Sequence, residues 1–310
     1  MKSDLPKVLH EVVGLPMLFF VIEVMHEAGV DRPVVVVGNG KDLVRRRFVD
    51  AGVTFVDQDR QLGTGHAVIT ARSAFEAHQG SVVVINGDNP LLQARTIRAA
   101  LDLCDRTAAS CVVVTAEVAE PKGYGRIIRN EAGFVTRIVE ERDASDQERQ
   151  VREINSGSYI FNAPDLAGCI DRLSTENDQH EYLLTDVVKL LNEQGKAVRA
   201  MVAADPTEVL GINSRKQLAE TASILRRRIN DRWMAEGVTL VSPDTTFIDP
   251  RATIGSDTVI EPFVIIRGPV CVGKGCRIGP FCDLTGPMQV PDGQEIAAGN
   301  PNVCKGKVDV

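Results

Sequence analysis

The chain has 310 residues, of which 44% are hydrophobic and 25% are charged, and its formal net charge is −7 at pH 7. This composition is typical of a globular protein with a sizeable core, and the length favours two domains. The acidic balance argues against nucleic-acid binding through a general basic field, and no apolar run is long enough to span a membrane.

The N-terminus lacks the apolar segment of a signal peptide, so we expect a cytoplasmic protein. The seven cysteines include no CxxC pair. Cys271, Cys276 and Cys282 stand among small and apolar residues, which predicts reduced core thiols rather than zinc ligands or disulfides.

The first two thirds of the chain alternate apolar, β-branched runs with amphipathic helical patterns. The predicted strands are Pro33–Val37, Val53–Val56, Ser81–Ile85 and Cys111–Thr115. The predicted helices are Met17–Ala28, Lys41–Ala51, His66–His78 and Ala94–Arg106. This alternation predicts a mainly parallel sheet covered by helices on both faces. Ligands bind beyond the carboxyl ends of the strands in such sheets, which directs attention to the residues after Val37, Val56 and Ile85.

From residue 123 to 161 the pattern changes to short strands separated by turns, which indicates an antiparallel insert. The strands expected there are Arg126–Arg129, Phe134–Glu140 and Ser158–Phe161. A helix at Glu181–Glu193 and a strand at Ala197–Val202 are expected to close the domain. Residues Ser214–Glu236 predict one long charged helix that could serve as a linker arm. Its arginines are interpreted as a solvated face, and they are Arg226, Arg227, Arg228 and Arg232.

The last seventy or so residues contain an aliphatic residue at every sixth position. The nine members of this series are Ile248, Ile254, Ile260, Ile266, Val272, Ile278, Leu284, Val290 and Ile296. This period fits neither an amphipathic helix nor simple strand alternation, and it is the signature of a hexapeptide β-helix whose aliphatic side chains stack inward. An ordinary β-sandwich is the alternative. Because one coil takes eighteen residues, about three coils fit. The polar end, Val303–Val310, is expected to fray.

Several short motifs offer groups for chemistry. In the segment KSDLPKVLH, Lys7 stands at the start of an apolar helical stretch, where an ammonium group could pair with a phosphate. Most lysines in such positions are simply exposed, so this motif alone is weak.

The segment QLGTGHA, residues 61–67, places Gly63 and Gly65 on either side of Thr64, between a strand and a helix. The glycines let the backbone approach a ligand, and Thr64, with Gln58 and Gln61 nearby, could hydrogen-bond a planar base. A plain glycine turn with Thr64 as the helix N-cap is an equally good interpretation. His66 is interpreted as structural, because no activating partner is evident.

Asp88, in the segment VVVINGDNP, follows the end of a buried strand. A lone carboxylate at this edge suits Mg²⁺, which needs few protein ligands, although a turn aspartate is the alternative. Asn213, in GINSR, is a candidate second metal ligand. Gly125 in GYGRI could allow backbone contact with a sugar, whose hydroxyls Glu140 and Asn155 could bind. Each of these signals is weak when it stands alone.

Taken together and in this order, the motifs resemble those of the bifunctional N-acetylglucosamine-1-phosphate uridyltransferase / glucosamine-1-phosphate acetyltransferase family. The matching segments are SDLPKVLH, QLGTGHA, GDNP, GYGRI, IVEERDA, EINSG, EYLLTD and GINSR. The family's domain order is also reproduced. The resemblance implies an α/β, Rossmann-like nucleotidyltransferase three-layer sandwich over residues 1–213. A helical linker arm at 214–236 and a short left-handed parallel β-helix at 237–310 would follow.

By the same resemblance, each motif residue acquires an expected role. Lys7 would contact phosphate and, with Asp88, serve catalysis. Gln58, Gly63 and Thr64 would read the uracil, and Asp88 and Asn213 would hold Mg²⁺. The residues expected to hold the amino sugar are Gly125, Glu140, Asn155 and Thr185. The implied reaction joins UTP and N-acetylglucosamine 1-phosphate into UDP-N-acetylglucosamine and releases pyrophosphate. Because both reactants are phosphates, alignment and charge neutralisation are the main tasks of the site.

Three departures from the family pattern bear on these expectations. The family opens with a strand and a glycine-rich loop, LAAGxGTRM, of which only the last residue aligns, with Met1. We interpret Met1 as a misplaced start, because a chain that truly began there would have a gap at the centre of its sheet and little activity. The β-helix is too short for the acetyltransferase and no histidine follows His180, so acetyl transfer is not expected. Leu183 and Asn86 stand where the family often has tyrosine, which leaves the sugar open.

The leading hypothesis is thus an Mg²⁺-dependent uridylyltransferase, with a homotrimer formed through the β-helix and no nucleic-acid or membrane partner. A sugar-1-phosphate nucleotidylyltransferase with another sugar or base is the second candidate. A scaffold or assembly protein without catalysis is the third, favoured if the chain truly begins at Met1.

Overall fold

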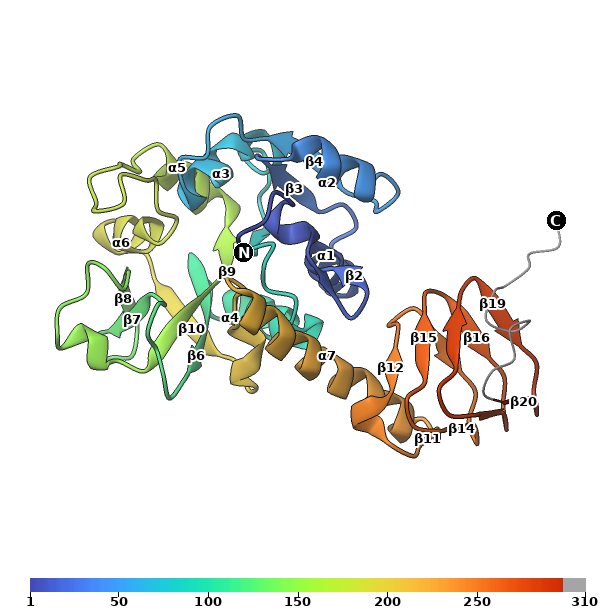
Figure 1. The fold of residues 1–310 in the computed structure, drawn as a ribbon. Coiled ribbons are helices and arrows are strands. Elements are labelled where there is room, and N and C mark those ends of the chain that lie inside the picture. Colours follow the sequence, from blue (N-terminus) through green and yellow to red (C-terminus); the bar gives the residue numbers. More distant parts are fainter. Residues whose placement is uncertain (298–310) are drawn as a thin grey trace. The chain divides into compact units, whose positions relative to one another are not determined.

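A computed structural model describes residues 1–297 of the chain (Figure 1). The described chain forms two compact units. The first comprises Met1–His10 and Met17–Ile212, and the second comprises Glu11–Pro16 together with the chain from Asn213 onward. No helix in the described part of the chain is both long and apolar enough to cross a lipid bilayer.

A mixed six-stranded sheet forms the centre of the first unit. Its strands run in the order β10-β6-β9-β7-β8, and β5 pairs with β9. They are β5 (Ser81–Val84), β6 (Cys111–Glu117), β7 (Arg126–Arg129), β8 (Val135–Val139), β9 (Glu153–Asn162) and β10 (Val198–Val202). Only β10 and β6 pair in parallel, whereas β9 runs antiparallel to β5, β6 and β7. The expectation of a mainly parallel sheet is therefore wrong, because periodicity reports burial and not strand direction.

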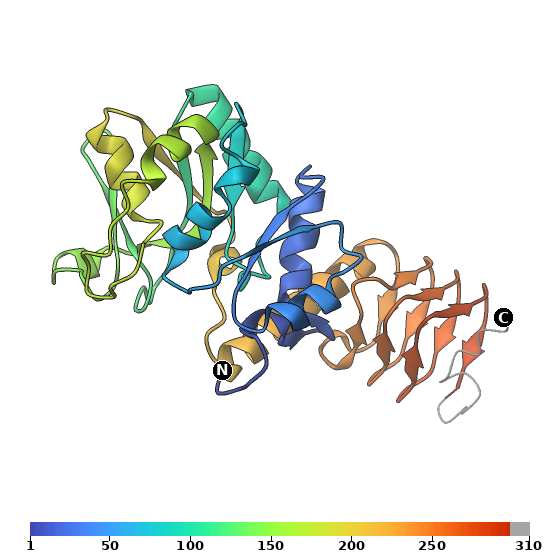
Figure 2. The same ribbon diagram turned by 90° about the horizontal axis from the view of Figure 1, so that it is seen from above.

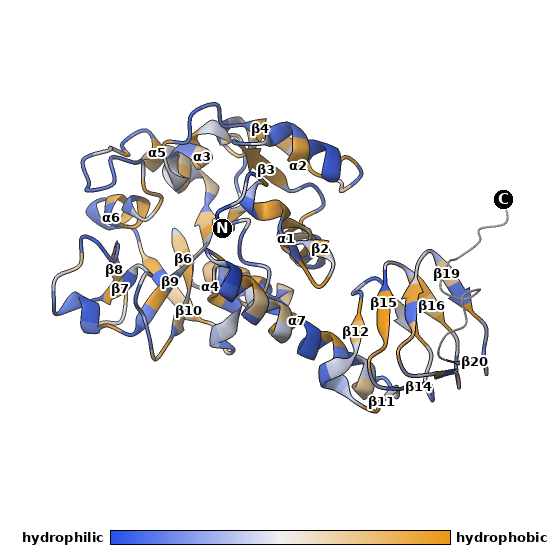
Figure 3. Ribbon diagram, in the orientation of Figure 1, coloured by the Kyte–Doolittle hydropathy of each residue, from blue (hydrophilic) through white to orange (hydrophobic). Residues whose placement is uncertain are grey.

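Helices cover both faces of this sheet, as the three-layer prediction requires. They are α3 (Thr64–Thr70), α5 (Ala163–Ile170) and α6 (Asp186–Glu193) on one face and α4 (Ala94–Thr107) on the other. Helices α1 (Met17–Glu27) and α2 (Lys41–Arg47) pack in a separate cluster with Val37 and Phe55. Val113 and Phe161 pack with α5 and α6 on one face. Val112 and Ile160 pack with α4 on the other face. Successive strand residues thus serve opposite layers, and Figure 3 shows the apolar strands of this Rossmann-like fold between polar outer surfaces.

Strands β3 (Val34–Val37) and β4 (Thr54–Asp57) form a separate, parallel, two-stranded sheet. Within residues 1–297, β3 pairs only with β4, and β5 pairs only with β9. Although β3 reads VVVV, Val34 is 38% exposed, whereas the first four residues of β6 are fully buried.

Several predicted boundaries shift. The helix expected at His66–His78 is split into α3 and a 3-10 turn, η2 (Arg72–Ala74). The helix expected to begin at Glu181 begins at Asp186, and α5 was not predicted from the sequence. The remaining 3-10 turns are η1 (Lys7–Leu9), η3 (Glu148–Gln150), η4 (Pro206–Val209) and η5 (Pro243–Thr245).

The second unit consists of a hairpin, a long helix and a parallel β-helix. The hairpin strands are β1 (Glu11–Val12) and β2 (Leu15–Pro16), and the helix is α7 (Arg215–Ala235). The coil strands are β11 (Thr239–Leu240), β12 (Phe247–Ile248), β13 (Thr253–Ile254), β14 (Val259–Ile260), β15 (Ile265–Arg267), β16 (Val270–Val272), β17 (Arg277–Ile278), β18 (Asp283–Thr285), β19 (Met288–Val290) and β20 (Glu295–Ile296). They stack into three parallel sheets, seen as rows of short arrows in Figure 2.

The hexapeptide series forms the core of this β-helix. Ile248 aligns with Ile266, which aligns with Leu284, so neighbouring coils are eighteen residues apart as predicted. All nine aliphatic residues of the series are buried. Of the three cysteines expected in this core, Cys276 and Cys282 are buried, but Cys271 is exposed. That prediction fails for Cys271 because it lies at the outward position of β16.

The C-terminal part of α7 packs against this core through Ile229 and Trp233. Four arginines of α7 were expected to form a solvated face, but this fails for Arg226. The Arg226 guanidinium lies 4.9 Å from the Phe247 ring centroid in a cation–π contact, and the Arg226 side chain is only 22% exposed. The frayed end expected at residues 303–310 lies outside the described range.

Candidate active site

Two turns of the first unit, each after the carboxyl end of a strand, lie against the segment that contains Lys7. Gly40, after β3, has a φ of +69°, and a Cβ there would lie 2.3 Å from Pro6 Cγ. The Pro6–Lys7 segment therefore lies directly against this turn. Gly87, after β5, would place a Cβ 3.2 Å from Val8. The segment containing Lys7 thus touches the turns after both β3 and β5, which the sequence predicts as ligand-binding edges.

Lys7 and Asp88 meet in this region as an ion pair between Nζ and Oδ2. Their side chains are 36% and 21% exposed, so both charges remain accessible to a ligand. We expected Lys7 to begin a helical stretch, but η1 has only three residues and the chain then turns into β1. A helix-terminal phosphate site is therefore absent there, and the Lys7 charge itself supplies the attraction.

The Gln61–Ala67 loop is held by a backbone-mediated contact with the segment before α6. Tyr182 N–H donates to the Leu62 carbonyl at 2.8 Å, and Gly65 N–H donates to the Tyr182 carbonyl at 2.8 Å. Gly63, with φ +106°, would place a Cβ only 2.5 Å from the Tyr182 carbonyl oxygen. The glycine at position 63 is therefore required by this close approach as well as by its backbone conformation.

The predicted base-reading side chains lie on the same loop or beside it. Gln58 Nε2 donates to the Gly63 carbonyl at 3.2 Å and lies 3.0 Å from His66 Nδ1. Thr64 Oγ1 accepts a hydrogen bond from Leu184 N–H at 3.1 Å. Thr64 makes no side-chain bond as a helix N-cap, so the N-cap alternative is wrong. The structural interpretation of His66 fits its contact with Gln58.

The four predicted sugar-binding residues converge around the GYGRI turn. A Cβ on Gly125 would lie 3.5 Å from Asn155 Cβ and 3.6 Å from Glu140 Oε1. Asn155 N–H donates to the Gly125 carbonyl at 2.9 Å. The Thr185 hydroxyl is hydrogen-bonded to the Glu140 carboxyl. Backbone carbonyl, carboxyl, carboxamide and hydroxyl groups thus come together, which is the set of groups that binds sugar hydroxyls and amides.

Burial raises the pKa of the Glu140 carboxyl, and the nearby Asp143 and Asp186 charges add to this effect. The hydrogen bond from Thr185 opposes it. The pKa of Asp186 is also raised, chiefly by burial. Carboxyls with raised pKa values are common at functional sites, although structural clusters produce them as well.

The base-reading and sugar groups adjoin each other. Leu184 bonds to Thr64, and its neighbour Thr185 bonds to Glu140. The turn after β5 is tied to the sugar group as well. Asn89 Nδ2 donates to the Ser156 carbonyl at 2.8 Å. The structure therefore brings nine of the ten predicted site residues together in the first unit.

Asn213, the tenth residue, is the first residue of the second unit's C-terminal part, just before α7. Its backbone N–H donates to Gln217 Oε1 at 2.8 Å. The preceding residue, Ile212, bonds through its N–H to the Asp88 carbonyl at 3.3 Å. Ile212, the last residue of the first unit, therefore passes directly beside Asp88.

The residues around Asp88 fit a lightly coordinated divalent cation. The described part of the chain holds no group of three or more His, Cys, Asp or Glu side chains arranged for metal binding. Asp88 is nevertheless a partly open carboxylate whose Oδ2 already attracts the Lys7 ammonium. A single accessible carboxylate suits Mg²⁺, which completes its shell with phosphate oxygens and water.

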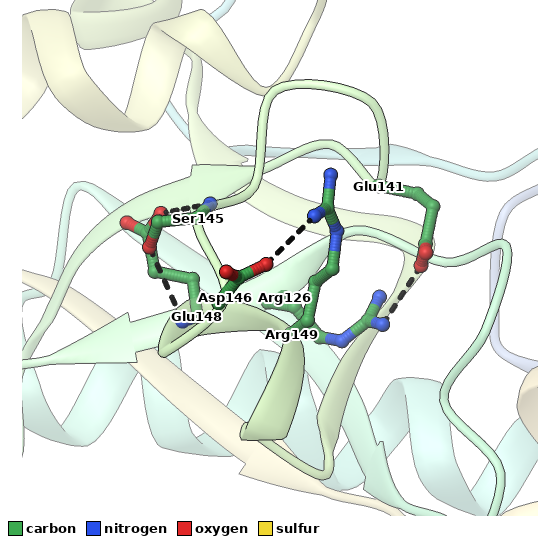
Figure 4. A network of polar contacts seen from close by, with 6 residues as sticks. All are labelled: Arg126, Glu141, Ser145, Asp146, Glu148 and Arg149. Carbon is green, nitrogen blue, oxygen red and sulfur yellow. Dashed lines mark hydrogen bonds and ion pairs between the residues drawn. The ribbon is translucent and has the colours of Figure 1, made fainter.

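A buried arginine near the sugar group was not foreseen from the sequence. Arg126, at the start of β7, has a side chain only 2% exposed, and its Nη2 donates to Glu141 Oε2 at 2.7 Å (Figure 4). Its Nη1 donates to the Tyr124 carbonyl. The sequence did carry a signal for this pair. Arg126 begins a strand that enters the core, and a buried arginine is rarely left without an acidic partner.

Comparison with known protein families identifies the class. The model of the nucleotidyl transferase family matches residues 2–228, so the chain belongs to that family. A second model, bacterial transferase hexapeptide (six repeats), matches residues 251–285 within the β-helix. Both halves of the sequence-based recognition are thereby confirmed, and the protein is a nucleotidyltransferase by family and fold.

Among the curated relatives is the bifunctional protein GlmU. The GlmU of Heliobacterium modesticaldum is 44% identical over 286 residues, covering 91% of this chain and 62% of the relative. The GlmU of Pelobacter propionicus is 46% identical over 301 residues, covering 97% and 65%. The chain thus spans less than two thirds of the length of these relatives.

Solved structures support the same fold. An apo UDP-glucose pyrophosphorylase superposes with a TM-score of 0.57 at 17% identity, covering 72% of this chain and 91% of that one. The enzyme complexed with UDP-glucose gives a TM-score of 0.59 at 18% identity, with the same coverages. At such identities the likeness concerns the fold alone.

Proposed function

We propose that this protein is a uridylyltransferase that makes UDP-N-acetylglucosamine from UTP and N-acetylglucosamine 1-phosphate. The observation that carries the proposal is the continuous contact from the Gln61–Ala67 loop, through Leu184 and Thr185, to Glu140 and Gly125. A base site and a sugar site are thereby adjacent, and Asn89, the neighbour of Asp88, is bonded to Ser156 beside the sugar site. This is the arrangement that joining a nucleotide to a sugar phosphate requires.

In the proposed reaction, a phosphate oxygen of the sugar 1-phosphate attacks the α-phosphorus of UTP. The new P–O bond forms as the bond to the leaving pyrophosphate breaks, and no proton or electron needs to be supplied. Gln58, Gly63 and Thr64 hold the uracil, and Lys7 contacts phosphate. Mg²⁺, held by Asp88 and Asn213, neutralises phosphate charge when bound. The expected absence of acetyl transfer is part of this proposal.

The sugar contacts follow from the convergence around Gly125. The Glu140 carboxylate accepts from a sugar hydroxyl or amide, Asn155 offers both a donor and an acceptor, and Gly125 allows the sugar to approach the backbone. Thr185 orients the Glu140 carboxyl. A site built to pair such groups rejects analogues that lack them, which gives selectivity among sugars.

Two observations keep a second candidate open, a nucleotidylyltransferase with another sugar or base. Asn86 lies against Gly157, where a Cβ would approach Asn86 Nδ2 within 2.1 Å, so a polar residue closes this edge of the sugar group. Leu183, which replaces a common tyrosine, is 9% exposed. A scaffold without catalysis is the third candidate.

A substrate panel separates these candidates. Purified protein is incubated with Mg²⁺, one nucleoside triphosphate and one sugar 1-phosphate, and pyrophosphate release is followed with a coupled assay. The proposal predicts the highest kcat/KM for UTP with N-acetylglucosamine 1-phosphate. A preference for glucose 1-phosphate or another triphosphate selects the second candidate, and no release with any pair selects the scaffold. A homotrimer, a cytoplasmic location and the absence of nucleic-acid or membrane partners remain parts of the proposal.

A further inference from the structure

Arg126 and Glu141 form a charged link beneath the sugar group that none of the predicted roles explains. Arg126 opens β7 and pairs in register with Val139 of β8 and Ile154 of β9. Arg126 thus lies where β7 and β8, which adjoin Gly125 and Glu140, meet the strand that contains Asn155, and its side chain is buried. Figure 4 shows it reaching Glu141, the residue directly after Glu140.

The link closes the GYGRI turn. Glu141 Oε2 accepts from Gly123 N–H at 3.0 Å and from Arg126 Nη2 at 2.7 Å. Arg126 Nη1 donates to the Tyr124 carbonyl. One carboxylate and one guanidinium thus bind the backbone of the two residues that precede Gly125. The pKa of Glu141 is lowered by its bond from Gly123 N–H and then by Arg126, so this carboxyl is charged at neutral pH.

The Arg126–Glu141 pair is not explained by a contribution to the stability of the fold. The Arg126 side chain is 2% exposed, and its Nε is buried without a hydrogen-bond partner in the described structure. Buried ion pairs often contribute little net stability compared with apolar residues of similar volume, because desolvation offsets the attraction. What the pair does supply is a fixed geometry, since the guanidinium is a planar fork that bridges two acceptors at set angles.

We propose that Arg126 is a positioning residue that acts through Glu141 and the Tyr124 carbonyl to hold Gly125 and Glu140 in place for the sugar. It does not touch the substrate. The inference rests on the proposed function, because it assigns the converging group to the sugar 1-phosphate. The base-reading group adjoins the sugar group but has its own backbone bonds to Tyr182, so a change at Arg126 should affect the sugar site more than the base site.

The test compares three variants of the full chain. Arg126→Met preserves most of the length of the side chain but removes the guanidinium and its hydrogen bonds. Arg126→Lys keeps the charge but can reach only one of the two acceptors. Arg149→Met is the matched control, because Arg149 belongs to the same network but pairs with the exposed Asp146 and makes no bond to the turn. For each variant, kcat and the KM of each substrate are measured.

For Arg126→Met, KM for the sugar 1-phosphate rises about tenfold, the loss expected for one charge-assisted hydrogen bond, while KM for UTP stays within about twofold. Arg126→Lys recovers part of the loss, and Arg149→Met resembles the unmodified protein. Equal rises in both KM values, or no rise in either, overturn the inference.

A second variant and a second measurement cover the other outcomes. If Arg126→Met does not fold, the same KM values are measured for Glu141→Gln, and the same selective rise for the sugar 1-phosphate is expected. This variant should fold, because Glu141 is 30% exposed and glutamine has nearly the same shape as glutamate. If the unmodified protein shows no turnover, the proposed function fails. Hydrogen exchange at the Gly123 amide then decides whether Arg126 fixes the turn. Exchange at least about tenfold faster in Arg126→Met than in Arg149→Met supports this role, and equal rates refute it.

Discussion

Substituting Gly63 with alanine tests whether the base-reading loop depends on its contact with Tyr182. Gly63 has φ +106° and ψ 177°, a region that is almost exclusive to glycine and costs other residues about 1–3 kcal/mol. The new Cβ would lie 2.5 Å from the Tyr182 carbonyl oxygen and 2.9 Å from Glu181 Cβ. Because the first of these atoms belongs to the backbone, the two segments must separate.

That separation weakens the two hydrogen bonds of Tyr182, to Leu62 and Gly65, each worth about 1 kcal/mol. Together with the backbone strain, we expect about 2–4 kcal/mol of destabilisation. For a domain of this size, 1 kcal/mol corresponds to roughly 2–4 °C in Tm, so Tm falls by about 5–15 °C. Since the displaced loop carries Thr64, UTP binding should weaken by about tenfold or more.

Gly133→Ala is the matched control, because Gly133 also has a positive φ, +82°, but nothing lies within 4 Å of a Cβ there. It bears only the backbone strain, about 1–2 kcal/mol, and leaves UTP binding unchanged. Tm is measured by scanning calorimetry and UTP affinity by titration calorimetry. If Gly63→Ala lowers Tm and UTP affinity no more than Gly133→Ala, the role given to the Tyr182 contact is wrong.

Three further predictions follow from burial and charge. Because the raised pKa of Glu140 means that burial opposes its charged form, this group favours the folded state at pH values below its unfolded pKa, and that contribution is lost as pH rises through the folded value. Glu140→Gln should therefore raise Tm at pH 8 relative to the unmodified protein, with the gain vanishing near pH 4, while the KM for the sugar phosphate increases; a gain in Tm that is larger at pH 4 contradicts the assignment. Ile278→Ala, at a fully buried position of the β-helix, should cost about 2–5 kcal/mol in chemical unfolding, whereas Arg277→Ala beside it, with its side chain 53% exposed, should cost under about 1 kcal/mol. Equal costs would mean that the inward series does not carry the core. Sedimentation equilibrium should give the mass of a trimer, and a monomer at micromolar concentration refutes that part of the proposal.

The β-helix was predictable because its signal is local and repeated. Each aliphatic residue of the series occupies the same inward position, whatever the rest of the chain does, and all nine are buried. The outward position of Cys271 follows from the same register, since it immediately precedes Val272 of the series. Its neighbours in sequence, which are small and apolar, were a poorer guide than the period.

The sheet was less predictable, because strand direction is not encoded in hydrophobic patterning. Strand β9 runs from Glu153 to Asn162, but its first half contains Asn155 and Ser156, so only its apolar second half was predicted. Those polar residues belong to the sugar group and to its contact with Asn89. The proposed sugar site would thus explain why polar residues interrupt the pattern that a strand normally shows.

The candidate site was recognised as a set of motifs, while the contacts between them required the structure. Nothing in the local sequence pairs Lys7 with Asp88, or Arg126 with Glu141, which are separated by other elements along the chain. Thr185 was assigned only through family resemblance, and the structure places its hydroxyl on Glu140. Long-range pairs of this kind arise from packing, which single-sequence patterns do not report.

The central claim is nucleotidyl transfer at the turn after β5, and pyrophosphate release by Asp88→Ala tests it most directly. The variant and the unmodified protein are assayed with UTP, N-acetylglucosamine 1-phosphate and Mg²⁺, and the folded fraction of each is checked by circular dichroism. The account predicts release by the unmodified protein and a loss of at least about a hundredfold in kcat for the variant, because phosphate alignment and neutralisation at that carboxylate fail together. Release by a folded Asp88→Ala variant at the unmodified rate would contradict it.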